Sequence, residues 1–414
     1  MTTKHGLSNA LFGALFGLSL LVLAFFGWRT VYSEPSAIFT RIASSTAAAS
    51  AKIPKGPVAT HIPTPQAVKA IYMSQCAAGT PSFRADLMGL IEATELNAIV
   101  IDIRDYTGKI AFPTDHPLLH EYVSDECGAN DMREFVASLH GKNIYVIGRI
   151  TVFQNPAYTK MHPEHAVQHE GGGVWKDYKG LSFVDVGARP YWESVVALSK
   201  ESYDIGFDEL NFDYIRFPSD GNMRATLYTW GVGKSKPAAL EEFFKYLHDE
   251  LKPIGAVLSA DLFGMVTTNT DDLNIGQVLE RALPYFDFIA PMVYPSHYPK
   301  GFHGYTDVNA NGYNIVHFSM SEAVRRTIAT TSSVDALAHT RIGTSTPAVY
   351  SKISYPASKM RPWLQDFDYP VEYTPAMVRA QIQANEDAGL NSYMFWDPAN
   401  KYSSLRQILG TEAD

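Results

Sequence analysis

Short apolar stretches alternate with longer amphipathic ones over most of the chain. Residues 68–74 are apolar and β-prone, whereas Phe83, Leu87, Leu90 and Ile91 in the next segment recur at helical spacing. The same alternation continues along the chain and predicts eight strands, at 68–74, 98–105, 144–153, 208–217, 255–263, 286–295, 360–367 and 392–398. The helices that it predicts lie at 82–96, 130–142, 190–203, 237–251, 275–283, 319–331 and 375–389.

Eight strands that alternate with helices indicate repeated βα units, and this number of units closes a (β/α)8 barrel of the TIM type. An open doubly wound sheet is the alternative, but no Gly-x-Gly-x-x-Gly sequence follows the first strand. The segment 341–350 also has strand character. We assign it to the loop before the seventh strand, and we expect one α/β barrel domain over 66–414.

The residues before the first predicted strand have a different composition. Residues 7–28 contain no charge, and roughly 20 apolar residues are enough for a transmembrane helix. The first Ala-x-Ala sequence, at 47–51, lies well beyond this segment, which favours an uncleaved anchor over a removed signal peptide. Residues 30–65 are rich in Ser, Ala, Thr and Pro, as in a flexible tether. The sequence thus predicts an N-terminal membrane anchor at 1–29, a linker at 30–65 and the barrel at 66–414.

The location of the barrel follows from this anchor. Lys4 and Arg29 flank the apolar segment, so the charge asymmetry that orients such segments is nearly balanced. We expect a single-pass anchor in the cytoplasmic membrane with the barrel outside the cytoplasm; secretion, or release into the periplasm after cleavage, is the alternative. An exported domain would permit the two cysteines, Cys76 and Cys127, to pair, although two unpaired thiols are equally compatible with the sequence.

Charge and composition narrow the class of ligand. The formal net charge is −9 and no dense run of Lys and Arg is present, which argues against nucleic acid as a partner. Aromatic residues make up 12% of the chain, and their flat apolar faces with a polar edge suit stacking on sugar rings. We expect a neutral or weakly charged ligand and no cofactor.

Polar and aromatic side chains gather where the predicted strands end. In a barrel of this kind the carboxyl ends of the strands carry the chemistry, and deeper positions form packing layers. The residues at these ends are Asp102, Arg104, Arg149, Asp213, Arg216, Asp261, Tyr294, Gln365, Asp366, Trp396 and Asp397. We therefore expect them to converge on one mouth of the barrel.

The fourth strand carries an unusual number of acids. Alternation along "DELNFDYIRF" places Glu209, Asn211 and Asp213 on one face, with Asp213 nearest the mouth. On the fifth strand, Ser259 and Asp261 share a face in the same way. A strand end that opens into a cleft can hold such acids, because they meet water, arginines and a ligand there.

A pair of carboxylates is what cleavage of a glycosidic bond needs: one stays ionised as nucleophile or base, and the other gives a proton to the leaving oxygen. Arg216 close to Asp213 would favour the ionised form, whereas Asp261 lies between apolar neighbours and would keep its proton to higher pH. We assign Asp213 as nucleophile and Asp261 as acid. The alternative is that either acid only pairs with an arginine of the barrel.

A histidine-rich loop offers a second kind of site. His165 and His169 are spaced i, i+4, and His162 lies nearby, so zinc is one interpretation. We find no third ligand at a convincing spacing. We therefore interpret these residues as ordinary loop histidines and assign no metal site.

Six stretches, taken in order, resemble one known family. They are "VIDIRDYTGKI", "DELNFDYIRFP", "SADLFG", "APMVYPSHY", "RPWLQDF" and "YMFWDPAN". Together they are similar to a bacterial family of glycosyl hydrolases related to the amylase-like (β/α)8-barrel enzymes, and the resemblance runs from about Lys69 to Tyr402. In the amylase-like enzymes the nucleophile is an Asp at the end of strand four, which corresponds to Asp213. Their acid is usually a Glu that ends strand five, where this sequence departs with Asp261.

The resemblance to chitinase-type barrels is partial. Met292, Tyr294 and Trp396 are similar to residues that line those sites, but Ile215 stands where those enzymes have an essential Glu. Substrate-assisted hydrolysis of N-acetyl sugars is therefore not expected.

The sequence predicts a membrane-anchored glycosidase that cleaves an extracytoplasmic or cell-envelope polysaccharide, with Asp213 and Asp261 as the catalytic pair. We expect the substrate to be bound by Asp102, Arg104, Arg149, Asn211, Arg216, Tyr294, His297, Trp363, Gln365, Trp396 and Asp397. The alternative is a non-catalytic carbohydrate-binding barrel that organises envelope polysaccharide.

Overall fold

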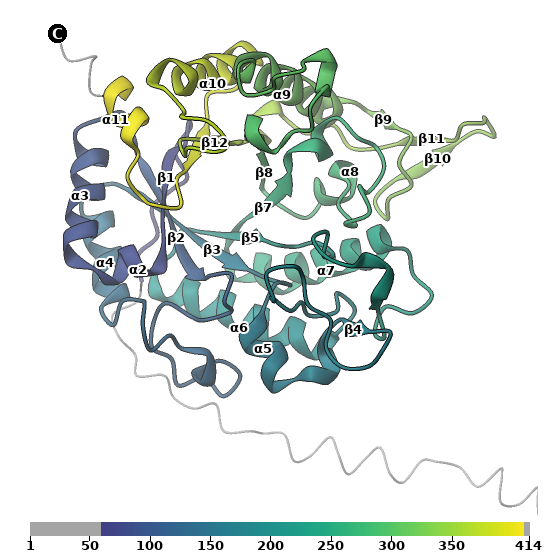
Figure 1. Ribbon diagram of the computed structural model, residues 1–414, viewed down its shortest axis with the longest axis horizontal. Coiled ribbons are helices and arrows are strands. Elements are labelled where there is room, and N and C mark those ends of the chain that lie inside the picture. The colour runs from purple at the N-terminus through teal and green to yellow at the C-terminus, as the bar shows by residue number, and fades with distance from the viewer. Residues whose placement is uncertain (1–58, 410–414) are drawn as a thin grey trace, which may run out of the picture. The chain divides into compact units, whose positions relative to one another are not determined.

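Eight parallel strands close a barrel in the computed structural model, which describes residues 59–409. Around the barrel the order is β1, β2, β3, β5, β7, β8, β12 and β13, and β13 pairs with β1 to close it (Figure 1). Neighbours in the barrel are therefore successive barrel strands along the chain, as in a (β/α)8 fold. The strands are Lys69–Met73 (β1), Ala98–Arg104 (β2), Tyr145–Thr151 (β3), Glu209–Asp213 (β5), Val257–Phe263 (β7), Phe288–Met292 (β8), Trp363–Gln365 (β12) and Tyr393–Trp396 (β13).

Helices connect the strands and cover the outside of the barrel (Figure 1). Of the apolar stripe predicted for α3, Leu87, Leu90 and Ile91 are buried, whereas Phe83 in the first turn is 44% exposed. The helices are Gln75–Gly79 (α2), Pro81–Glu92 (α3), Met132–His140 (α4), Pro156–Met161 (α5), Arg189–Ile205 (α6), Lys236–Leu251 (α7), Leu279–Ala282 (α8), Gly312–Ile328 (α9), Pro375–Asp387 (α10) and Ser403–Leu409 (α11).

These elements confirm the predicted closed barrel and exclude the open doubly wound sheet. All eight predicted strands are present, and a helix overlaps each of the seven predicted helical segments. Two helices differ in extent from the prediction. Helix α8 is a single turn, and α9 begins at Gly312 rather than at Ser319.

The segment 341–350 lies outside the barrel but is not a plain loop. It belongs to a hairpin of β10 (Thr340–Ile342) and β11 (Val349–Ser351), and β11 also pairs antiparallel with β9 (Thr331–Ser332). The hairpin projects from the side of the barrel in Figure 1. A second two-stranded sheet joins β4 (Gln168–His169) and β6 (Thr226–Leu227).

The interior of the barrel below the mouth is a packed core. Its inward side chains include Val68, Ala70, Tyr72, Ala98, Val100, Tyr145, Ile147, Ala290, Trp363 and Met394. At the amino-terminal end, Arg361 Nη1 donates to both carboxylate oxygens of Glu209, at 2.9 and 3.0 Å, and the Tyr145 hydroxyl donates to the same carboxylate. Glu209, the deepest acid of the fourth barrel strand, thus belongs to a buried ion pair with a structural role.

The N-terminal predictions fall largely outside the described residues. The predicted anchor at 1–29 and the predicted linker up to residue 58 are not part of them. Within residues 59–409 no helix is both long and apolar enough to cross a membrane. The end of the predicted linker contacts the barrel, because the Ile62 N–H donates to Asp208 at 2.8 Å and the Thr64 hydroxyl hydrogen-bonds that of Tyr145.

The two cysteines form a disulfide. Cys76 lies in α2 and Cys127 in the loop before α4, and their Cα atoms are 4.4 Å apart. Of the two alternatives that the sequence leaves open, the structure has the paired form. The bond ties the helix after β1 to the long connection after β2.

Candidate active site

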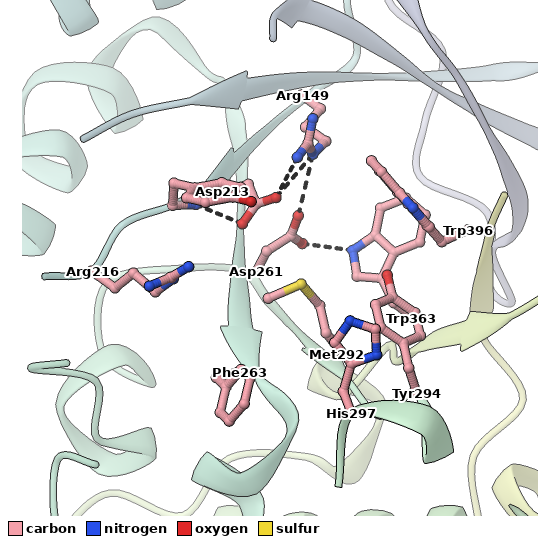
Figure 2. A pocket seen from close by; sticks show the side chains of 11 residues that line it. Arg149, Asp213, Arg216, Asp261, Phe263, Met292, Tyr294, His297, Trp363 and Trp396 are labelled. Carbon is pink, nitrogen blue, oxygen red and sulfur yellow. Dashed lines mark hydrogen bonds and ion pairs between the residues drawn. The ribbon is translucent and has the colours of Figure 1, made fainter. Parts of the chain in front are cut away.

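A cavity of about 200 Å³ lies among the carboxyl ends of the barrel strands (Figure 2). It contains both acids that the sequence proposes as the catalytic pair, and these come from neighbouring strands, β5 and β7. The side chains around it are Arg149, Asp213, Tyr214, Arg216, Asp261, Phe263, Met292, Tyr294, His297, Trp363 and Trp396.

Asp213, at the end of β5, lies against the guanidinium of Arg149 from β3. Arg149 Nε donates to Asp213 Oδ2 at 3.1 Å, and Nη2 donates to the same oxygen. The other oxygen, Oδ1, accepts the N–H of Tyr214, which has a φ of 50°. This left-handed conformation is uncommon for a tyrosine, and it turns the chain so that the N–H meets the carboxylate. A full positive charge is therefore fixed beside Asp213.

The expectation that Arg216 is the partner of Asp213 is wrong. Arg216 donates to the Phe217 carbonyl oxygen and to Ser219 Oγ, and its guanidinium lies over the Tyr214 ring at 4.9 Å. Alternation along the strand places position 216 on the face opposite to Asp213, and β5 ends at Asp213, so Arg216 is not brought to the Asp213 carboxylate. It lines the cavity at a place separate from Arg149, without an ion pair to Asp213 (Figure 2).

Asp102 and Tyr72 lie on the other side of Arg149. Arg149 Nη1 donates to Asp102 Oδ1 at 2.6 Å, and the Tyr72 hydroxyl donates to Oδ2 at 2.5 Å. Burial raises the pKa of Asp102 to about 6, although the Arg149 charge opposes this. Burial also opposes the charge of Arg149, but the carboxylates of Asp213 and Asp102 outweigh it and hold the pKa of Arg149 well above its usual value.

Asp261 on β7 has a different environment. Its Oδ1 accepts the Asn211 amide at 2.9 Å and the Trp363 indole N–H at 2.8 Å, while its Oδ2 lies 3.9 Å from Arg149 Nε. Burial, followed by the negative charge of Asp213, raises the pKa of Asp261 well above its usual range. Since Oδ1 already accepts two donors, a proton on this carboxyl group belongs on Oδ2.

Aromatic rings form the wall opposite the acids. Trp396 stacks on Tyr72 with ring centroids 3.9 Å apart, and Trp363 meets Trp396 edge to face at 5.7 Å. The Arg149 guanidinium lies 4.9 Å from the Trp396 ring, a cation–π distance. Tyr294 is buried among these groups, and burial together with the charges of Asp261 and Asp213 raises its pKa, so its hydroxyl stays neutral.

The predicted substrate-binding residues divide into three groups. Those that line the cavity are Arg149, Arg216, Tyr294, His297, Trp363 and Trp396. Asp102 and Asn211 lie one layer behind it, where they contact Arg149 and Asp261. Arg104, Gln365 and Asp397 do not line it.

The three residues outside the cavity form hydrogen bonds with backbone groups instead. Arg104 Nε donates to the Thr151 carbonyl oxygen, and the Gln365 amide donates to the carbonyl oxygens of two residues in the following loop. Asp397 accepts the N–H groups of Ala399, Lys401 and Tyr402 and so fixes the turn after β13. An acid or amide at a strand end serves a loop as readily as a substrate, which explains why the sequence pattern included them.

Four residues that shape the site are absent from the predicted set. Tyr214, Phe263 and Met292 line the cavity, of which only Met292 is noted in the resemblance to chitinase-type barrels, and Tyr72 orients Asp102 from behind. Tyr72 and Phe263 occupy inward positions at strand ends, a signal that was available, because residues two apart on a strand share a face. The position of Tyr214 depends on its positive φ. In a sequence, glycine or asparagine usually indicates such a conformation, and this position has a tyrosine instead.

One group of side chains within the described residues has donor atoms close enough to hold a metal ion, namely His162, Glu164 and His165. None of the three lines the cavity. His169 belongs to β4 and is not part of this group, so only His162 and His165 of the three loop histidines lie together. Glu164 is the third member of the group, which the sequence spacing did not reveal.

The protein is a closed parallel barrel with two carboxylates and an aromatic wall at the carboxyl ends of its strands. It therefore belongs to the (β/α)8-barrel proteins, an architecture that glycoside hydrolases commonly have. The chain belongs to the family described as "Putative glycosyl hydrolase domain", whose sequence model matches residues 70–402. The family resemblance expected from the six sequence stretches is thereby confirmed. No curated protein matches the chain.

The solved structures that this chain resembles include a glycoside hydrolase domain with the same fold. The glycoside hydrolase domain of PgaB (BpsB) from Bordetella bronchiseptica superposes with a TM-score of 0.56 at 13% identity, over 84% of this chain and 100% of that one. A hypothetical protein from Ruminiclostridium thermocellum ATCC 27405 has 32% identity and a TM-score of 0.42, over 46% of this chain and 96% of that one. The maltogenic α-amylase AmyB from Thermotoga neapolitana has 13% identity and a TM-score of 0.36, over 62% of this chain and 54% of that one.

Proposed function

We propose that the protein is a glycoside hydrolase that uses Asp213 and Asp261 as its two carboxylates. The observation that carries this proposal is the contrast between the two acids within one cavity. Both acids are buried, but Asp213 contacts the Arg149 guanidinium through Oδ2, whereas Asp261 has a pKa well above its usual range. Two neighbouring acids with such different environments suit a mechanism in which one is ionised and the other protonated.

The roles follow from these environments. Asp213 acts as the ionised group beside the Arg149 charge. It either attacks the anomeric carbon to form a glycosyl ester that water then hydrolyses, or takes a proton from a water that attacks this carbon. Asp261 gives the proton on Oδ2 to the glycosidic oxygen, so that the part of the substrate attached through this oxygen leaves as a neutral alcohol. Asp213 Oδ2 and Asp261 Oδ2 both lie within 4 Å of Arg149 Nε, at 3.1 and 3.9 Å, so the two carboxyl groups are close to each other.

The shape of the cavity supports a sugar as the bound group. Its volume of about 200 Å³ is of the size of a single sugar ring. Trp396 and Tyr294 present aromatic surface on one side, and the acids and Arg149 lie on the other. Such an arrangement stacks the apolar face of a sugar while its hydroxyl groups meet hydrogen-bonding partners.

We further propose that the substrate is an extracytoplasmic or cell-envelope polysaccharide. The uncharged segment 7–28, outside the described residues, supports a single-pass anchor in the cytoplasmic membrane. The disulfide between Cys76 and Cys127 supports an oxidising compartment for the barrel, because such bonds persist outside the cytosol.

A second candidate is a carbohydrate-binding barrel without catalysis. It is favoured by the fact that both oxygens of Asp213 already accept hydrogen bonds, from Arg149 and from the Tyr214 N–H. A nucleophile engaged in this way keeps only one free lone pair, on Oδ1, because Oδ2 accepts both Arg149 donors.

One experiment separates the two candidates. The full-length protein, purified in detergent, is incubated with a panel of envelope and storage polysaccharides, and both reducing-end release and binding are measured. The hydrolase proposal expects release from at least one polymer and its loss in Asp261→Asn. Binding without any release over long incubation would support the second candidate, and equal release by wild type and Asp261→Asn would refute the assignment of the acid.

A further inference from the structure

Two histidines and a glutamate converge in the loop between β3 and α6. His162 directly follows α5, and Glu164 and His165 lie in the 3-10 turn Pro163–His165 (η2). Glu164 Oε1 is 3.5 Å from His162 Nδ1 and 3.6 Å from His165 Nε2. The two imidazole rings are nearly parallel, at 12°, with centroids 5.4 Å apart. The three ligand atoms all lie within 4.8 Å of one another.

The spacing of these atoms matches a metal site better than a hydrogen-bonded cluster. Both distances from the Glu164 oxygen exceed the ~2.7–3.2 Å of a typical N–H···O hydrogen bond. Ligands held at about 2.1 Å from a tetrahedral zinc ion lie roughly 3.4 Å from one another. A cation between the three atoms therefore needs only small side-chain movements to reach ordinary coordination distances.

A neighbouring tyrosine orients one of the ligands. The Tyr158 hydroxyl is 2.8 Å from His165 Nδ1. When Nδ1 carries the ring proton and donates it to this hydroxyl, the lone pair of His165 is on Nε2, the nitrogen that faces Glu164. Second partners of this kind commonly fix the tautomer and the ring orientation of metal-bound histidines.

A tryptophan from another connection packs against the loop that carries the cluster. Trp230, from the connection after β5, meets the His165 ring edge to face at 5.1 Å and donates its indole N–H to the Glu164 carbonyl oxygen at 2.8 Å. The side chain of His165 is 12% exposed, while those of His162 and Glu164 are 39% and 60% exposed. A cation can thus enter from solvent and find one ligand already fixed.

We propose that His162, Glu164 and His165 form a binding site for a divalent transition-metal ion of the Zn²⁺ type. Two imidazole nitrogens and one carboxylate oxygen are a donor set that zinc favours, and a fourth position is left for water. The ion would fasten η2 to α5, which carries Tyr158. Because none of the three ligands lines the cavity with Asp213 and Asp261, this site is distinct from the proposed catalytic one.

The test is a metal titration of the full-length protein after removal of metals with a chelator. ZnCl2 binding is measured by calorimetry, and CoCl2 is added separately to record the visible absorption that reports four-coordinate cobalt. We expect one ion per chain. His162→Ala and His165→Ala should each weaken binding at least tenfold, and Tyr158→Phe should weaken it roughly tenfold without changing the stoichiometry.

Two further variants keep the test decisive. His169→Ala is the matched control, because this histidine is close in sequence but not part of the group, and it should bind Zn²⁺ as the wild type does. Glu164→Gln changes an exposed side chain, so it remains informative if a histidine variant fails to fold. The proposal is overturned if the wild type binds no stoichiometric ion, if Glu164→Gln and His162→Ala bind as the wild type does, or if His169→Ala loses binding equally.

Discussion

Arg149 donates from two nitrogens, Nε and Nη2, to a single carboxylate oxygen of Asp213, and both side chains are almost fully buried. Its third nitrogen, Nη1, donates to Asp102. One guanidinium thus holds two acids, of which Asp213 lines the cavity and Asp102 does not. Both acids contribute to the same buried network, but in our proposal only one of them contacts the substrate.

Asp102→Asn should lower stability while leaving most of the activity. The variant weakens a hydrogen bond to a charged group, which contributes about 1.5–3 kcal/mol, while Arg149 keeps its contact with Asp213. We expect the free energy of unfolding to fall by roughly this amount and turnover of the folded protein to fall less than about tenfold. Urea denaturation and a turnover assay on the same sample check both values. A loss of more than a hundredfold in a fully folded variant would mean that Asp102 takes part in the reaction.

Trp363→Phe should move the alkaline limb of the pH–rate profile to higher pH. The proposed acid must be protonated, so activity falls as pH rises through the pKa of Asp261. The Trp363 N–H bonded to Oδ1 favours the charged carboxylate, and its removal raises the pKa of Asp261 further. Trp396→Phe is the control, since Trp396 lines the same cavity without a hydrogen bond to Asp261 in the described structure. A limb that stays in place or moves to lower pH in Trp363→Phe would contradict the assignment.

The stability of the protein should fall between about pH 4 and pH 7 through Asp366. Burial raises the pKa of Asp366 to about 7, against the hydrogen bond from the Leu405 N–H. Over this range the folded state keeps a proton that the unfolded state has lost, so stability decreases as pH rises, by on the order of 2–4 kcal/mol. Asp366→Asn can still accept the Leu405 N–H without this penalty. The variant should therefore be more stable than wild type at pH 7.5 and nearly equal at pH 4; parallel stability curves would rule out this role.

Removal of the disulfide should destabilise the barrel without changing its chemistry. Cys76 and Cys127 are separated by 51 residues, and closing a loop of this length in the unfolded chain corresponds to about 4 kcal/mol in the chain-entropy model. We expect Cys76→Ser to lose about 2–4 kcal/mol of unfolding free energy, with turnover unchanged at temperatures where it is folded. Equal denaturation curves with and without reductant would show that the bond contributes nothing.

The architecture was accessible from the sequence because the barrel strands are short, strongly apolar and separated by helices of ordinary length. Alternation also placed Asn211 and Asp213 on the inward face of the fourth barrel strand, as observed. The partner of Asp213 was not accessible in this way. It depends on the register between β3 and β5, which pairs Thr151 with Asp213 and brings Arg149, two residues earlier, beneath the carboxylate.

Two other differences have local causes. Arg216 is close to Asp213 in sequence, but residues three apart on a strand lie on opposite faces, and the turn at Tyr214, with its positive φ, follows the end of the strand. The i, i+4 spacing of His165 and His169 suggests a shared helical face. The chain there forms a 3-10 turn followed by a strand, so the residues that converge are His162, Glu164 and His165.

The most direct test of the central claim compares two isosteric changes at the same guanidinium. Asp213→Asn and Asp102→Asn each remove one negative charge beside Arg149, and only the first removes a group that lines the cavity. The rate of reducing-end release is measured for both full-length variants under conditions where both are folded. Our account predicts a loss of roughly a thousandfold or more in Asp213→Asn and less than about tenfold in Asp102→Asn. Wild-type activity in Asp213→Asn, or the same loss in both variants, would contradict it.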